Sequence, residues 1–170
     1  PPDWFADAYF DAFVDTLAPT VTAGVDALYP DGDEDDPDVG IEEITAYWAD
    51  RGRRMSAADH VRARATVQGY VQRWVEWFRD VDVFVSPVVP MPPPPLGTFY
   101  EDGGVQRSLE QVHLNPQANS SGQPSIALPV TEHDGWPVAV QFTSSHGRDG
   151  LLLDLAEAVR PTVPVVRRNA

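Results

Sequence analysis

Apolar residues recur at intervals of three and four along several stretches of the chain, and this spacing predicts helices. The longest helix is expected over residues 57–79 and the last over residues 148–159. Shorter helices are expected over residues 3–18, 20–29, 41–50 and 106–113. Pro19 is predicted to separate the first two of these, because a proline inside a helix removes a hydrogen bond and clashes with the preceding turn.

The longest predicted helix has both a start signal and an apolar face. Ser56 and Asp59 have the form of a capping box, in which two side chains satisfy backbone N–H groups of the first turn. The apolar face is expected to consist of Ala58, Val61, Ala65, Val71, Trp74, Val75 and Phe78. Aromatic residues at this spacing commonly pack against another element, so we interpret Trp74 and Trp77 as packing residues.

Three stretches are predicted as β-strands. Residues 82–87 contain the continuous apolar run Val83-Phe84-Val85, which is typical of a strand buried on both faces. Residues 125–128 and 138–142 are apolar runs joined by the turn signal His133-Asp134-Gly135, and they dominate the stretch Asn119–Gln141. Three strands are too few to bury both faces of a sheet, so we expect either that another segment completes the sheet or that the chain exposes a large apolar surface.

A proline-rich segment, residues 87–95, follows the first predicted strand. One interpretation is a rigid loop at the C-terminal end of the strand, where ligands bind in sheets that are covered by helices. The other is a polyproline ligand for a domain of the SH3 type.

The net charge of −14 is concentrated at one end of the chain. Residues 1–50 hold 14 Asp and Glu and no Arg, whereas residues 51–170 hold 12 acidic residues and 12 Arg. Nucleic acid is not an expected partner, because binding phosphates needs a basic face. An alternative explanation of the acidic net charge is a surface adapted to high salt. No apolar run approaches the ~20 residues of a membrane span and no signal peptide is visible, so we expect a cytoplasmic protein.

The acidic stretch Asp31–Asp38 has a partial resemblance to a calcium-binding loop. The residues at loop positions 1, 3, 5 and 12 are Asp31, Asp33, Asp35 and Glu42. Position 6, where the sharp turn needs glycine, is Asp36. The alternative is a solvated acidic loop, and we predict neither a metal site nor a cofactor.

No self-sufficient catalytic site is predicted. The chain has no cysteine, which excludes thiol nucleophiles, and no lysine, which excludes a lysine base. It has no Gly-x-Ser-x-Gly nucleophile elbow, so Ser120 and Ser121 are not predicted as nucleophiles. No pair of histidines has the spacing of metal ligands; the four are His60, His113, His133 and His146.

Four motifs, taken in order, resemble the C-terminal part of amidase signature enzymes. They are Asp82-Val83-Phe84-Val85-Ser86-Pro87, Asn119-x-x-Gly122-x-Pro124-Ser125-Ile126-x-Leu128-Pro129, Asp134-Gly135-x-Pro137-Val138-Ala139-Val140-Gln141 and Leu151-Leu152-x-x-Leu155-Ala156. The resemblance covers residues 56–157. It implies an α/β fold with a mixed β-sheet covered by helices on both faces, which is incomplete without an N-terminal segment.

The same resemblance implies hydrolysis of a carboxylic amide. In that family a Ser–cis-Ser–Lys triad performs the chemistry, and its lysine and Gly/Ser-rich signature lie in the N-terminal half. Neither is present in this sequence. We therefore expect a partner, an N-terminal amidase segment or chain that carries the catalytic residues, and a small-molecule amide as substrate. The alternative is a non-catalytic binding or scaffold module with an amidase-like fold.

The resemblance also suggests a division of the chain and a substrate pocket. We expect an acidic helical segment over residues 1–55 with a loop at 30–40, the C-terminal part of an amidase-like domain over residues 56–160, and an extended tail over residues 161–170. The residues expected by position at the pocket are Ser86, Val88, Val89 and Met91 as its wall and Asn119 as an organiser of the neighbouring loop. Packing within the loop is the alternative role for the two valines. An apolar wall favours an apolar or aryl acyl group.

Overall fold

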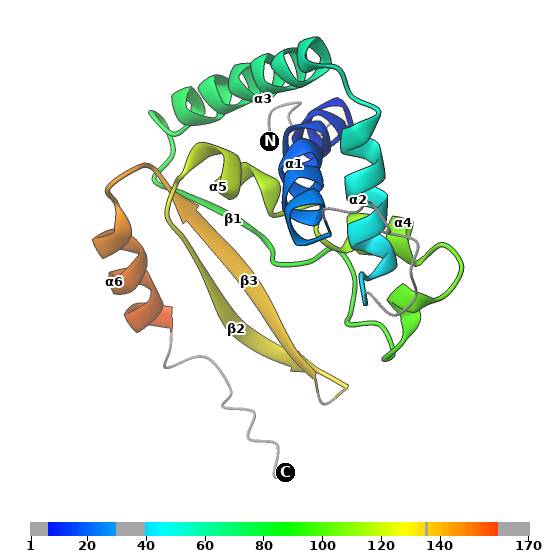
Figure 1. The fold of residues 1–170 in the computed structure, drawn as a ribbon. Coiled ribbons are helices and arrows are strands. Elements are labelled where there is room, and N and C mark those ends of the chain that lie inside the picture. Colours follow the sequence, from blue (N-terminus) through cyan, green and yellow to red (C-terminus); the bar gives the residue numbers. More distant parts are fainter. Residues whose placement is uncertain (1–6, 30–39, 135, 160–170) are drawn as a thin grey trace. The chain divides into compact units, whose positions relative to one another are not determined.

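The computed structural model describes residues 7–29, 40–134 and 136–159. The elements in this part are α1 (Asp7–Leu28), α2 (Glu43–Arg53), α3 (Ala57–Trp77), β1 (Val83–Pro87), the 3-10 helix η3 (Thr98–Tyr100), α4 (Gly104–Gln111), α5 (Pro116–Ser121), β2 (Ser125–His133), β3 (Trp136–Ser144) and α6 (Asp149–Val159). They are shown in Figure 1. The acidic stretch 31–38 and the tail 161–170 lie outside the described residues.

The chain divides into two compact units, each built from two segments. The first takes in Pro1–Tyr70 and Met91–His113, and the second takes in Val71–Pro90 and Leu114–Ala170. Among the described residues, no helix is both long enough and apolar enough to cross a membrane.

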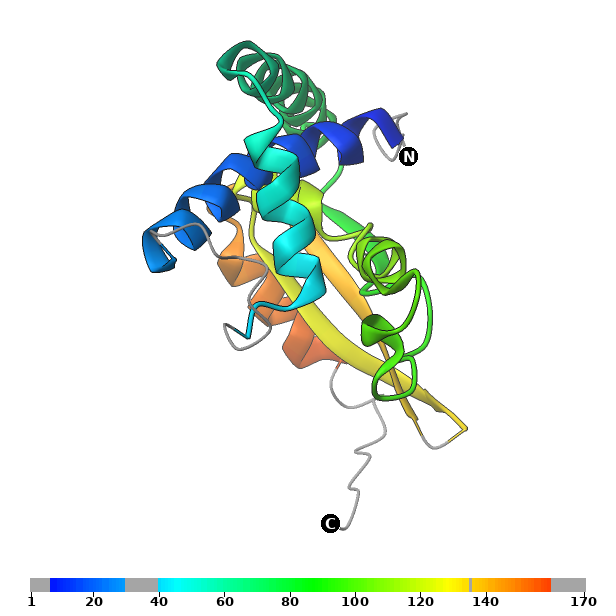
Figure 2. The same cartoon turned by 45° about the vertical axis from the view of Figure 1, so that its right-hand side comes forward.

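In the first unit, α2 packs closely against α1 (Figure 2). Ala18 of α1 and Ala49 of α2 are completely buried, and the hydroxyl oxygen of Thr22 lies 2.8 Å from the carbonyl oxygen of Ala49. A side chain at Gly52 would put its Cβ 2.6 Å from the carbonyl oxygen of Ala18. Small residues therefore set the short distance between the two helices.

The predicted break at Pro19 is wrong, because α1 continues through this residue to Leu28. Ala18 and Thr22, which lie on either side of the proline in the sequence, both contact α2. A third contact, an ion pair between Asp15 and Arg51 with a distance of 2.7 Å, lies on the N-terminal side of the proline. These tertiary contacts hold both halves of α1 in line and outweigh the local cost of the proline.

The capping box predicted for α3 is confirmed. The Asp59 carboxylate accepts the Ser56 N–H at 3.0 Å, and the Ser56 hydroxyl oxygen accepts the Asp59 N–H at 3.2 Å. The Ser56 hydroxyl also donates to the Asp59 carboxylate at 2.6 Å. This bond, the one from the Ser56 N–H and one from Arg62 lower the pKa of Asp59 to about 2.

The predicted apolar face of α3 is partly wrong. Ala58, Val61, Ala65 and Val75 are exposed. The buried residues of the helix are Ala63, Val67 and Trp74. The helix has apolar residues on two faces, and the sequence does not say which face meets the rest of the protein. In the first unit the chosen face places Tyr70 against Tyr9, with ring centres 5.2 Å apart.

The second unit contains an antiparallel sheet with strand order β1-β3-β2, which agrees with the α/β class predicted. The β2–β3 hairpin extends several residues beyond the two predicted apolar runs. Its turn contains Asp134 in the left-handed region, with φ 50°. The register of β2 shifts between Pro129 and Thr131, so β2 carries a bulge. Helix α6 lies along this hairpin (Figure 1).

The prediction that β1 is buried on both faces is wrong for this chain. Its Phe84 ring contacts Trp74 and Trp77, with ring centres 5.3 and 5.8 Å away. Val85, which points to the opposite face of the strand, is 53% exposed. The described part of the chain therefore covers one face of β1 with aromatic side chains and leaves the other largely open.

Candidate functional site

Three of the five residues expected at the substrate pocket follow one another at the end of β1. Ser86 is buried, 7% exposed, and pairs in register with Gln141 of β3. Val88 and Val89 come directly after the strand and are half-buried. Pairing with β3, the central strand, thus fixes the point at which the segment after β1 leaves the sheet.

The other two expected residues lie in different settings. Met91 is half-buried and belongs to the first unit. Asn119 is exposed and lies on α5, in the second unit. Helix α5 ends at Gly122, which has φ 71° and donates its N–H to the carbonyl oxygen of Ala118 at 2.9 Å. A glycine with this φ provides the left-handed residue that ends many helices.

Polar side chains at the end of β3, of which Gln123, Thr143 and Ser144 are buried, form a cluster that was not predicted from the sequence. Gln123 donates from Nε2 to the carbonyl oxygen of Ser144 at 3.0 Å. The Ser144 hydroxyl donates to the carbonyl oxygen of Asp82 at 2.7 Å, and the hydroxyls of Thr143 and Ser125 lie 2.8 Å apart. These bonds tie together the start of β1, the start of β2 and the end of β3. The sequence signal that could have indicated this cluster is the polar residues at the start of β2 and at the end of β3, next to apolar runs.

Ser121 and His146 lie close together but do not form a nucleophile–base pair. His146 lies with Nε2 2.7 Å from the backbone carbonyl oxygen of Ser121, and not against a hydroxyl. The Ser121 hydroxyl contacts the carbonyl oxygen of Ala118 at 3.4 Å. Activation of serine requires a base within hydrogen-bond reach of its hydroxyl, so this arrangement has a structural role.

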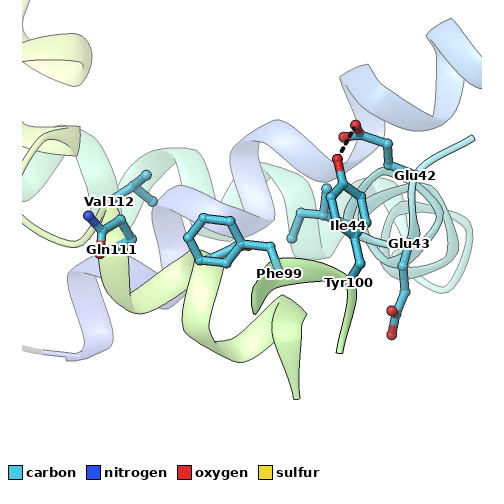
Figure 3. A pocket seen from close by; sticks show the side chains of 8 residues that line it. Glu42, Glu43, Ile44, Phe99, Tyr100, Gln111 and Val112 are labelled. Carbon is cyan, nitrogen blue, oxygen red and sulfur yellow. Dashed lines mark hydrogen bonds between the residues drawn. The ribbon is translucent and has the colours of Figure 1, made fainter. Parts of the chain in front are cut away.

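A cavity of about 310 Å³ lies in the first unit, between the start of α2, η3 and α4. We call it the α2–α4 pocket. Its lining residues are Glu42, Glu43, Ile44, Phe99, Tyr100, Ser108, Gln111 and Val112. Figure 3 shows the Phe99 ring between Val112 at one end and Ile44 and Tyr100 at the other. Glu42 was considered only as position 12 of the calcium-loop alternative, and the other lining residues were not predicted as site residues, because their proximity depends on segments far apart in the sequence.

Two polar groups meet at one end of the α2–α4 pocket. The Tyr100 hydroxyl donates to the Glu42 carboxylate at 3.1 Å (Figure 3). This hydrogen bond, together with the negative charge of Glu42, raises the pKa of Tyr100. The phenol therefore stays protonated and anchors η3 to the start of α2.

The calcium-loop alternative falls largely outside the described residues. Asp31, Asp33 and Asp35 are not among them, and Glu42 accepts the hydrogen bond from Tyr100. Over residues 7–29, 40–134 and 136–159, no three His, Asp or Glu side chains gather as a metal site would require.

Comparison with known proteins connects this fold to amide-cleaving enzymes. Residues 18–153 match the family model described as Amidase. The chain is 32% identical over 130 residues to 6-aminohexanoate-cyclic-dimer hydrolase of Paenarthrobacter ureafaciens, a match covering 69% of this chain and 25% of that protein. It is 32% identical over 155 residues to one of the subunits of glutamyl-tRNA(Gln) amidotransferase of Halobacterium salinarum, covering 91% of this chain and 31% of that protein. A third relative, indoleacetamide hydrolase of Bradyrhizobium japonicum, is 30% identical over 133 residues, covering 75% of this chain and 29% of that protein.

Solved structures show the same fold. The structure of 6-aminohexanoate cyclic dimer hydrolase complexed with substrate superimposes with a TM-score of 0.79 at 22% identity, covering 99% of this chain and 38% of that chain. The present chain spans about a quarter to a third of the length of the curated relatives named above. The order of the four motifs, the antiparallel hairpin with its adjoining helix and the family match agree: the chain belongs to the amidase family.

Proposed function

We propose that this chain is the C-terminal part, or a separate subunit, of a cytoplasmic amidase that hydrolyses a small carboxylic amide. The observation that carries the proposal is the match of residues 18–153 to the amidase family. In this role the chain adds strands to a larger mixed sheet and forms part of the substrate pocket. The largely open face of β1, with Val85 53% exposed, is a surface that such an assembly would cover.

The catalytic residues come from another segment or chain in this proposal. None of the 170 residues is a lysine, and the Ser–cis-Ser–Lys chemistry of amidase signature enzymes requires one. The length of the chain relative to the curated amidases that it matches leaves room for such a segment.

The substrate-binding role is assigned to the segment after β1 and to α5. Ser86, Val88, Val89 and Met91 form the wall, and Asn119 organises the neighbouring loop. The first of these is held in the sheet, while the two valines and the methionine are half-buried apolar side chains that an acyl group can contact. This wall favours an apolar or aryl acyl group, and two relatives are named for such amides, indoleacetamide hydrolase and fatty acid amide hydrolase.

The decisive experiment measures ammonia release from 2-phenylacetamide and from glutamine. The 170-residue chain is assayed alone and after co-expression with an amidase segment that carries the Gly/Ser-rich signature and its lysine. We expect no turnover by the chain alone. The assembly should hydrolyse the aryl amide faster than glutamine, and replacement of the lysine of the added segment by alanine should abolish the activity.

Each failure has a distinct meaning. Turnover by the purified chain alone would contradict the assignment of the catalytic residues to another segment. A stable assembly that contains the lysine but hydrolyses neither amide would favour the non-catalytic scaffold. Faster turnover of glutamine would agree with amidase activity but would contradict the proposed preference for an apolar acyl group.

A further inference from the structure

We propose that Ser86 and Gln141 bind the NH2 group of a primary carboxamide, with Gln141 as a further substrate-binding residue. This site rests on the proposed amidase function, because the carboxamide is that of the substrate. Both residues belong to the second unit, and their strands pair with each other.

The register of the sheet places Ser86 and Gln141 side by side. Ser86 of β1 lies directly opposite Gln141 of β3, and Ala127 of β2 lies opposite Gln141 on its other side. Residues that are opposite in antiparallel strands point to the same face of the sheet. Ala127 is exposed and has a small side chain, so it takes up little of the space beside the Gln141 carboxamide.

Neighbouring side chains fix the orientation of the Gln141 carboxamide. Its Nε2 donates to the Thr143 hydroxyl oxygen at 3.4 Å, and that oxygen lies 2.8 Å from the Ser125 hydroxyl oxygen. Thr143 is 2% exposed, so this anchor is inside the protein. Because nitrogen and oxygen stand on opposite arms of a carboxamide, Oε1 is directed away from Thr143 and can accept a hydrogen bond.

Two acceptor oxygens at this position have no partner in the described part of the chain. Ser86 is 7% exposed, yet its hydroxyl makes no hydrogen bond over these residues, and neither does Oε1 of Gln141. A buried polar group without a partner is unfavourable and is rare in folded proteins. A ligand with two N–H donors would satisfy both oxygens.

The spacing of the two side chains matches one NH2 group. Two oxygens that each lie about 2.9 Å from one nitrogen, along N–H bonds about 120° apart, are about 5 Å from each other. The Cβ atoms of directly opposite residues in antiparallel strands are about 4.5–5.5 Å apart. Ser86 and Gln141 therefore stand at the separation that lets one NH2 group donate to both.

The surroundings favour a neutral group with an apolar substituent. Ser86, Gln141, Thr143 and Ser125 carry no charge, so an ion here would lose hydration without gaining a counter-charge. Half-buried apolar side chains follow directly after the strand, at residues 88–89. A carboxamide bound at Ser86 can thus continue into an acyl group that lies along this segment.

The test compares two ligands that differ only in the group at this site. They are 2-phenylacetamide and 1-phenyl-2-propanone, in which a methyl group replaces NH2. Calorimetry measures their binding to the assembly of this chain with the added amidase segment, whose lysine is replaced by alanine so that the amide is not consumed. We expect the amide to bind about tenfold more tightly than the ketone, as two net hydrogen bonds would give.

Variants assign this preference to the two side chains. Ser86→Ala and Gln141→Met should each weaken binding of the amide about threefold or more and leave binding of the ketone unchanged. Ser86→Thr keeps the hydroxyl and should keep the preference. Gln72→Met, which replaces an exposed glutamine on α3 in the same unit, should change neither affinity.

Equal affinities of the wild-type assembly for amide and ketone would overturn the site, as would the absence of binding of either ligand to the folded assembly. Variants that weaken both ligands equally would show that Ser86 and Gln141 have a structural role only. Because the readout is binding, an assembly that prefers the amide without hydrolysing it would keep this site and contradict the amidase function alone.

Discussion

At the residue scale, Gly52 is a position where the packing of α1 against α2 leaves no room for a side chain. A Cβ here would lie 2.1 Å from the Thr22 hydroxyl oxygen and 2.6 Å from the Ala18 carbonyl oxygen. The hydroxyl can turn away, but the backbone oxygen cannot, so α1 and α2 would have to separate. We predict that Gly52→Ala lowers the free energy of unfolding by about 2 kcal/mol, measured by urea denaturation.

Gly24 provides a matched control on the facing helix. A Cβ at this position has no neighbour within 4 Å, and alanine is the better helix former. Gly24→Ala should therefore raise the free energy of unfolding by about 0.5–1 kcal/mol. Equal effects of the two substitutions would show that helix propensity, and not the contact with α1, decides the outcome at Gly52. The sequence alone marks both positions only as helical glycines, because the difference between them lies in the partner helix.

At the element scale, the capping box at the start of α3 makes a pH-dependent contribution. The pKa of Asp59 is lowered to about 2, so the stabilisation is complete above the unfolded-state pKa of about 3.9 and is lost as the pH falls through 2. We predict that Asp59→Asn is less stable than wild type at pH 6 and that the difference shrinks below pH 4. Ser56→Ala should cost about 1 kcal/mol at pH 6. Urea denaturation followed by helical circular dichroism measures both.

The conservative variant Asp59→Glu keeps a carboxylate at the position that capping boxes favour and should retain most of the stability. A pH-independent gap between wild type and Asp59→Asn would contradict the assigned role of the carboxylate.

The elements that local signals define were predicted well, and those that depend on contacts were not. The capping box and the apolar spacing place α3 and α6 within a few residues of their true bounds, and the turn signal places the hairpin. Helix α5 was missed because Pro-Gln-Ala-Asn-Ser-Ser carries no apolar period. The continuity of α1 across Pro19 and the choice of the buried face of α3 depend on partners that the sequence does not reveal.

The candidate site shows the same limit. The position of Ser86 at the end of a strand follows from the apolar run before it, and the structure agrees. The α2–α4 pocket joins Glu42 to Tyr100, which are 58 residues apart in the sequence, so no local pattern predicts it. Arguments from sequence therefore found the family and the strand ends but not the cavity.

At the scale of the whole molecule, the uneven charge should make stability depend on salt. The first 50 residues hold 14 acidic side chains and no arginine, so repulsion within this stretch exceeds the attraction of its few ion pairs. Salt screens exposed charges over a distance of about 10 Å at 0.1 M. We predict that the urea midpoint rises as KCl is increased from about 0.02 to about 0.5 M, across the range in which this screening becomes effective.

A double variant, Asp11→Asn with Glu43→Gln, should reduce this salt dependence because it removes two exposed charges from the same stretch. A midpoint that falls with KCl would mean that ion pairs such as Arg51–Asp15 outweigh the repulsion.

The edge position of β1 has a consequence for how the protein is produced. Within the described sheet β1 pairs only with β3, and Val85 is 53% exposed. A strand edge with an apolar side chain beside it is a template for self-association, and Pro87 interrupts it only at its last residue. In the proposed assembly, a cell therefore has to make this chain and the segment that covers β1 promptly and at matched levels, since uncovered chain would be directed to aggregates or to proteolysis.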